Sequence, residues 1–109
     1  MAKKNGPQSR VYVGLRKRHP KAFAAIENLG RAIRNEGPLD ERLSHLVQLA
    51  ASAAIRSEGA VHSHARRALE AGATPAEVHH ALLLLTSTIG FPNVVAAISW
   101  ADDVMRKPR

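Results

Sequence analysis

The sequence predicts an all-α fold, a compact bundle of helices in a single domain. Apolar residues recur at intervals of three and four along most of the chain, and no segment alternates between apolar and polar residues as a half-buried strand would. Glycine and proline separate the periodic segments. With 109 residues, 45% of them hydrophobic and 23% charged, the chain is long enough for one modest core. Because aromatic residues make up only 4%, we expect close helix–helix contacts and an advantage from oligomerisation.

The first 19 residues are interpreted as a basic, flexible N-terminal arm, and residues 20–109 as the all-α domain. Residues 1–8 contain Gly6 and Pro7 and have the composition of a flexible leader. The segment from Val11 to Arg18 is compatible with a strand-like piece or with a short helix, and both readings stay open at this point.

The first helix of the domain is predicted to begin at Pro20, because proline is well tolerated in a first helical turn. Its apolar residues recur at helical spacing and precede the stop at residues 36–38: Ala22, Phe23, Ile26, Leu29, Ala32 and Ile33. A second helix is predicted to start at Asp40, a good N-cap. Its apolar positions are Leu43, Leu46, Val47, Ala50, Ala53 and Ala54.

A third helix is predicted to end at Gly72, because glycine readily adopts the positive φ that terminates many helices. Residues 57–59 before it are a short link or a kink. Helical spacing places His64 on the apolar stripe of Val61, Ala65 and Ala68. His62 falls on the other side, with Arg66 and Glu70, and is expected to face solvent.

The fourth helix has the sharpest local signal of the chain. Thr74 is a predicted N-cap, Pro75 suits the first helical position, and Glu77 completes a capping box. Residues 81–85 that follow are five consecutive apolar residues, so this helix is expected to be buried on several sides or to lie at a subunit interface. After a break at residues 90–93, a last helix runs through the apolar residues Val94, Ala97, Ile98, Ala101 and Met105, and residues 106–109 form a solvated tail.

Composition excludes several classes of function. Without cysteine the chain has no disulfide, no thiolate metal site and no thiol redox chemistry. No apolar run approaches the roughly 18–20 residues of a membrane span, and no secretory signal is present, so we expect a cytoplasmic protein without membrane contact.

The net charge of +7 is concentrated at the N-terminus. Seven cations and no acid lie within the first 21 residues, whereas the remainder is neutral. The arm is interpreted mainly as a solubilising leader, with salt-sensitive contact to nucleic acid or to another acidic surface as the alternative. A DNA-reading helix-turn-helix around residues 68–78 is rejected because its second helix is apolar.

Histidine is the remaining source of chemistry. His45 and His64 are both predicted near inward faces, and an imidazole pair there would transfer protons near neutral pH. No two histidines have the i, i+4 spacing of a helical metal site, so a metal would have to be held across helices, for example by His45 and His64. A serine nucleophile at Ser57 or Ser63 is a weaker alternative, because neither lies in a G-x-S-x-G elbow.

The region from about Pro20 to Met105 resembles the carboxymuconolactone decarboxylase family, which includes the alkylhydroperoxidase D-like proteins. Three segments carry the resemblance: Leu39-Asp40-Glu41-Arg42 opening a helix, residues 64–78 (HARRALEAGATPAEV), and Gly90-Phe91-Pro92. Members with this pattern are small all-α proteins, commonly trimers or hexamers. The resemblance therefore implies a helical bundle that forms a homo-oligomer.

The peroxidase branch of that family carries C-x-x-C-x-x-x-H, and alignment on His64 places its thiols at Ser57 and Ala60. Thiol peroxidase activity is thus excluded. The glutamate of that branch's proton relay falls on His45. The decarboxylase branch also lacks the cysteine pair and retains the histidine.

By resemblance, His64 and His45 are therefore the candidate catalytic residues for thiol-independent proton transfer on a small organic acid or lactone, with no cofactor and no metal required. Arg56 and Arg67 are the alternatives for a cation that binds the substrate carboxylate. A non-catalytic oligomeric binding module and a histidine metal site are the competing readings of the same scaffold.

Overall fold

Helix boundaries fall where the sequence places the caps. The structure, a computed structural model, describes residues 7–105 and contains seven helices within that range: α1 (Pro7–Arg18), α2 (Pro20–Arg34), α3 (Glu41–Ala54), α4 (Glu58–Glu70), α5 (Pro75–Leu83), α6 (Thr86–Ile89) and α7 (Phe91–Met105). No strand occurs among these residues, which confirms the all-α class. The expected leader at residues 1–8 (apart from Pro7 and Gln8) and the expected tail at residues 106–109 lie outside the described residues.

Side-chain caps start helices α3 and α5. Asp40 Oδ1 accepts a hydrogen bond of 2.9 Å from the backbone N–H of Leu43 and so begins α3. At α5, Thr74 Oγ1 accepts from the Glu77 N–H and Glu77 Oε1 accepts from the Thr74 N–H, each at 3.0 Å. The predicted capping box is therefore confirmed. Gly72, at φ 107°, ends the α4 segment as expected.

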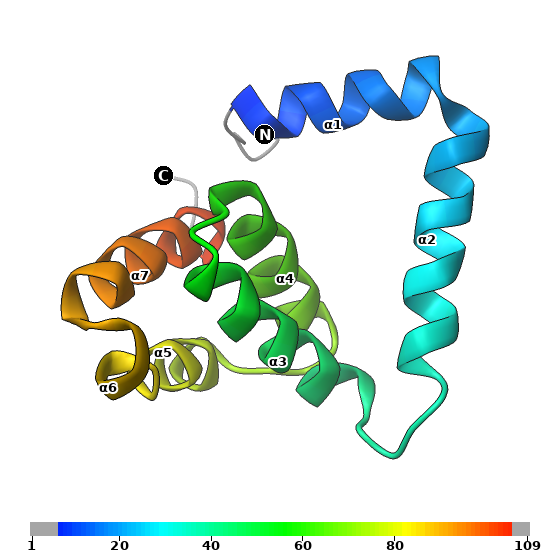
Figure 1. Ribbon diagram of the computed structural model, residues 1–109. Helices are drawn as coiled ribbons and strands as arrows, with labels where there is room; N and C mark the ends of the chain where they lie inside the picture. Colours follow the sequence, from blue (N-terminus) through cyan, green and yellow to red (C-terminus); the bar gives the residue numbers. More distant parts are fainter. Residues whose placement is uncertain (1–6, 106–109) are drawn as a thin grey trace.

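The body of the molecule consists of α3, α4, α5 and α7 (Figure 1). Helix α4 lies between α3 and α7, and α5 packs across α3 and α7. Eight of the ten residues of the core cluster are alanine or valine, which lets the helix axes approach closely. The core cluster comprises Leu49, Ala53, Val61, Ala65, Ala68, Ala73, Val78, Leu82, Ala97 and Ala101.

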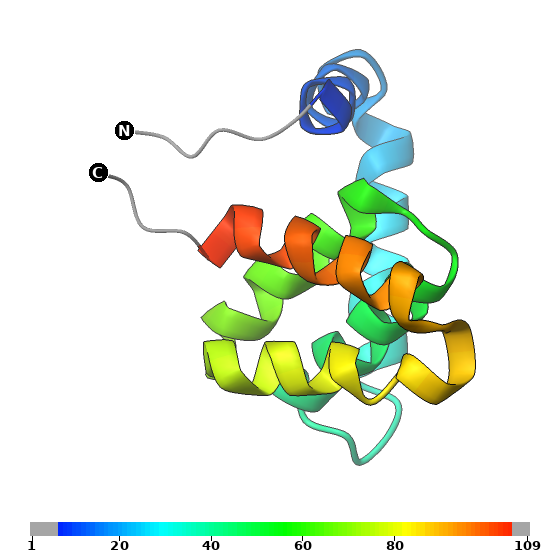
Figure 2. The same ribbon diagram turned by 90° about the vertical axis from the view of Figure 1, so that its left-hand side faces the viewer.

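Helices α1 and α2 form a separate layer beside this body (Figures 1 and 2). The open choice for residues 11–18 is resolved in favour of helix, because they belong to α1. The rings of Tyr12 and Phe23 meet edge to face with centroids 4.8 Å apart, and Glu27 accepts from the Tyr12 hydroxyl at 3.4 Å. No residue of α2 is buried. Its apolar stripe therefore stays exposed in the single chain, with Ile26, Leu29 and Ile33 62%, 60% and 63% accessible.

The apolar run at residues 81–85 is only partly buried. Leu82 is fully buried, whereas Leu83 and Leu84 are exposed because α5 ends at Leu83 and the chain turns into α6, an element that the sequence did not predict. Gly90 then adopts φ 90° before α7 begins. No helix among residues 7–105 has the length and apolar content needed to cross a membrane.

Candidate functional site

His45 and His64 face each other across the contact between α3 and α4. Their Nδ1 atoms are 3.3 Å apart and their ring centroids 5.5 Å apart. His45 is 1% exposed and His64 is half-buried. The structure thus brings together the two histidines that the sequence singles out, although they are 19 residues apart.

Both imidazoles have lowered pKa values. Burial, which disfavours the charged ring, is the main cause, and together with the neighbouring His45 and the charges of Arg67 and Arg34 it lowers the pKa of His64 to about 4. Burial is also the first cause at His45, whose pKa is lowered again by Arg34 and Arg67 and raised by Glu41 and Glu70. Both rings are accordingly neutral at neutral pH, so one Nδ1 donates a hydrogen and the other accepts it.

Glu41 favours one of the two donor assignments. Its Oε2 lies 3.9 Å from Nε2 of His45, one helical turn away on α3. This negative charge favours a proton on His45 Nε2, which leaves His45 Nδ1 as the acceptor and His64 Nδ1 as the donor. His64 then carries its free lone pair on Nε2.

A cleft between the α1–α2 layer and the body opens beside His64. Its volume is about 270 Å³, and its walls are Tyr12, Ile26, Glu27, Gly30, Arg31, Arg34, Gln48, His64 and Arg67. Three arginines face one carboxylate there, so the cleft is cationic. The side-chain oxygen of Gln48 is buried without a hydrogen-bond partner among the described residues. The cleft therefore has the charge and size to take a small anion that also carries a hydrogen-bond donor.

Of the two arginines that the sequence offers as substrate cations, Arg67 lines this cleft and Arg56 does not. Arg67 lies on α4 one turn after His64 and lines the cleft with it. Arg56 instead donates to Asn93 Oδ1 and places its guanidinium 5.9 Å from the centre of the Trp100 ring. The sequence did not identify Arg34, which reaches the cleft from α2.

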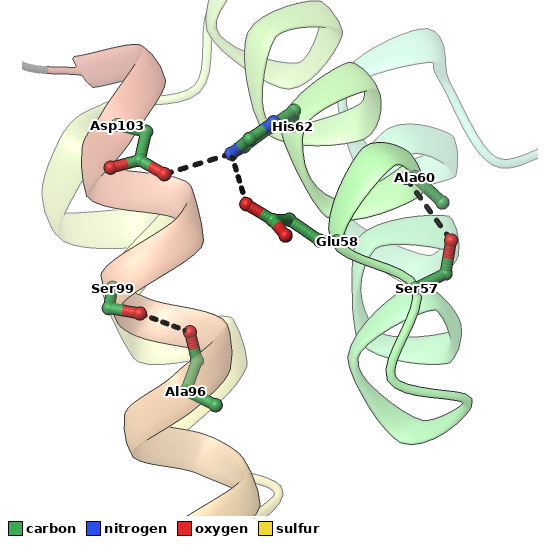
Figure 3. A network of polar contacts seen from close by, with 7 residues as sticks. All are labelled: Ser57, Glu58, Ala60, His62, Ala96, Ser99 and Asp103. Atoms are coloured by element: carbon green, nitrogen blue, oxygen red, sulfur yellow. Dashed lines mark hydrogen bonds and ion pairs between the residues drawn. The ribbon is translucent and has the colours of Figure 1, made fainter. Parts of the chain in front are cut away.

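The positions of the missing thiols have a structural role here. Ser57 is the N-cap of α4, and its Oγ accepts a hydrogen bond of 3.3 Å from the Ala60 N–H (Figure 3). The pair that holds cysteines in the peroxidase-like sequences is therefore a helix cap in this chain.

The expected solvent exposure of His62 is wrong. His62 is 9% exposed, and its Nε2 lies 3.0 Å from Asp103 Oδ2 on α7 (Figure 3). His79 makes a similar contact, with Nε2 2.7 Å from Asp102 Oδ1. Helical periodicity missed both pairs because their acids lie 41 and 23 residues away in the chain. The adjacent aspartates, the only acids of α7, were the available signal.

The fold and the site define a small helical protein in which a neutral, buried imidazole pair lies beside a cationic cleft. The sequence pattern of the Carboxymuconolactone decarboxylase family matches residues 20–103, and the chain belongs to this family. The matched region begins at α2 and includes both histidines of the pair.

A curated relative is similar to most of this chain. The uncharacterized protein MJ1511 of Methanocaldococcus jannaschii is 29% identical over 84 residues, which cover 77% of this chain and 78% of the relative. No solved structure matches the chain.

Proposed function

We propose that this chain is a thiol-independent enzyme that moves a proton on a small organic acid or lactone, with His64 as the acid/base and His45 as its partner. The observation that carries the proposal is the Nδ1–Nδ1 contact of 3.3 Å between two neutral imidazoles at the wall of a cationic cleft. The family's name supports decarboxylation or a lactone reaction as the type of chemistry.

The arginines supply the affinity for the substrate. A carboxylate in the cleft pairs with Arg67 and Arg34, the two cations that lower the pKa of His64. Their positive field is offset once the anion is bound. The pKa of His64 then rises, and its Nε2 becomes a stronger base in the presence of substrate than in its absence.

The imidazole pair both holds the proton that the reaction needs and delivers it. Once the carboxylate is bound, His64 Nε2 takes up a proton from water, and His64 Nδ1–H is held by His45 Nδ1, so the positive charge is shared by two rings. In a decarboxylation the C–C bond to the carboxylate breaks, CO₂ leaves, and the bonding electrons remain on the carbon as a carbanion stabilised by an adjacent carbonyl. That carbon then takes the proton from His64 Nε2, which returns to its neutral form.

Turnover of carboxylated lactones tests this proposal. Carboxymuconolactone, the compound in the family's name, is the first substrate, followed by simpler lactone acids, with release of CO₂ and loss of substrate as readouts. His64→Gln is expected to lower kcat about 100-fold or more, as loss of a general acid/base does. Arg67→Met is expected to raise KM more than it lowers kcat.

His80→Gln is the matched control, because His80 is an exposed histidine of the body that neither lines the cleft nor belongs to the His45–His64 pair. It is expected to retain wild-type turnover. Unchanged turnover in His64→Gln on a substrate that the wild type converts refutes the assignment of His64.

The family resemblance and the exposed face of α2 together support a homo-oligomer, a trimer or hexamer, as the working form. Ile26, Leu29 and Ile33 lie on one helical face and are each about 60% accessible in the single chain. A second copy that covers this stripe would also cover the cleft-lining side chain of Ile26. The working site would then be completed only on assembly.

A non-catalytic binding module is the second candidate, favoured by the exposure of Arg10, Lys17 and Arg18 on α1. Helix α1 has no acidic residue in its first turn and three basic residues in its last turn. Such a module would bind a short DNA duplex at low salt, with affinity that falls as salt rises. Replacement of the three residues by glutamine would abolish that binding, whereas absence of binding at low salt removes this candidate.

A further inference from the structure

Glu58, His62 and Asp103 bring three potential metal ligands together on the side of α4 that packs against α7 (Figure 3). One donor atom from each residue lies within 4.8 Å of the other two. We propose that these three residues form a binding site for a divalent transition-metal ion such as Zn²⁺, which joins the start of α4 to the end of α7.

The distances are close to those of a coordination sphere. Nε2 of His62 is 3.0 Å from Asp103 Oδ2 and 3.9 Å from Glu58 Oε2. Ligand atoms about 2.1 Å from a zinc ion are separated from one another by roughly 3.0–3.4 Å. The Asp103 oxygen is therefore already in place. Glu58 Oε2 lies farther from Nε2, and its side chain is partly exposed and therefore free to rotate towards an ion.

Charge also favours a cation at this point. Two carboxylates converge on one imidazole nitrogen, so the cluster stays negative even when His62 is protonated. No lysine or arginine among the described residues forms an ion pair with Glu58 or Asp103. A divalent ion would replace the proton on Nε2 and neutralise both acids.

The neighbouring pair of His79 and Asp102 shows what an ordinary histidine–aspartate contact looks like in the same fold. Its two atoms lie 2.7 Å apart, its aspartate comes from the same turn of α7 as Asp103, and no third acid lies within ligand distance. His62 is buried against α7, and Glu58 precedes it by one turn on the same face of α4, so two of the three ligands come from adjacent turns of one helix.

This site is distinct from the proposed catalytic pair. The only group of three such donors in the described part of the chain contains neither His45 nor His64. A metal ion bound by His45 and His64 would therefore be a different site, and the zinc titration described below distinguishes the two. The site's three protein ligands leave a fourth position for water, and its solvent-facing edge gives the ion a path of entry.

Titration of the untagged full-length protein with ZnCl₂, followed by calorimetry and by competition with a chromogenic chelator, tests the proposal. The wild type is expected to bind one equivalent of Zn²⁺ per chain and to gain thermal stability from it. Asp103→Asn and His62→Gln are each expected to weaken binding by about tenfold or more and to lose the zinc-dependent rise in Tm. Asp103 is exposed, so its variant is expected to fold even if His62→Gln does not.

Asp102→Asn is the matched control, since it removes the parallel histidine–aspartate contact without touching the three ligands. It is expected to bind zinc as the wild type does. His45→Gln is the second control and is also expected to leave zinc affinity unchanged. The proposal is overturned if the wild type binds no Zn²⁺, if Asp103→Asn binds with wild-type affinity, or if His45→Gln abolishes binding.

Discussion

Replacement of His64 by glutamine is expected to make the protein less sensitive to acid. In the unfolded chain this histidine takes up a proton near pH 6.5, whereas in the folded chain its pKa is lowered to about 4. Between these two values the unfolded state binds more protons than the folded state. The free energy of unfolding therefore falls as the pH is lowered from 6.5 towards 4. Above pH 6.5 the ring is neutral in both states and makes no such contribution.

The size of this effect follows from the shift. Each unit of pKa corresponds to about 1.4 kcal/mol, so the full loss attributable to His64 is about 3 kcal/mol when the pH has fallen below 4. Roughly 2 kcal/mol of this loss is already present at pH 5. Glutamine does not titrate. The variant should thus lose about 2 kcal/mol less stability between pH 7 and pH 5 than the wild type.

Urea unfolding followed by circular dichroism at pH 7, 6 and 5 measures this difference directly. The comparison uses the change in unfolding free energy with pH, so a constant offset from the lost His45–His64 contact does not affect it. His80→Gln, which removes an exposed histidine, is expected to follow the wild type. Parallel pH profiles for the wild type and His64→Gln would show that the ring is not held neutral by its surroundings.

Two further predictions concern the fold and its assembly. Thr74→Ala removes one of the two capping-box hydrogen bonds of α5 and is expected to lower the free energy of unfolding by about 1 kcal/mol. Urea denaturation measures this loss, and an unchanged unfolding midpoint would mean that the cap is not formed in solution. Ile26→Glu combined with Ile33→Glu places charge on the exposed stripe of α2 and is expected to reduce the oligomer to single chains while helix content is retained. Light scattering coupled to size-exclusion chromatography reads out the mass, and a wild type that is already monomeric contradicts the proposed assembly.

Local signals predicted the helices well because they depend on neighbouring residues. The Asp40 cap, the Thr74–Glu77 box and the Gly72 terminus all act within a few residues of the chain, and each is present where the sequence places it. The short α6 was missed because it follows the apolar run directly, with no side-chain cap to mark its start. The buried position of His62 was missed because its environment is created by α7, which lies about 40 residues further along the chain.

The sequence by itself determined the class of fold, the family and the absence of thiol chemistry. It also indicated that His45 and His64 lie near inward faces, because the spacing of apolar residues shows which side of a helix faces the core. Only the tertiary structure decided that these two rings meet, that Arg67 rather than Arg56 lies beside them, and that His62 is enclosed by two acids. Contacts between helices depend on how whole faces pack, and the periodicity of one helix contains no information about which residues of another it meets.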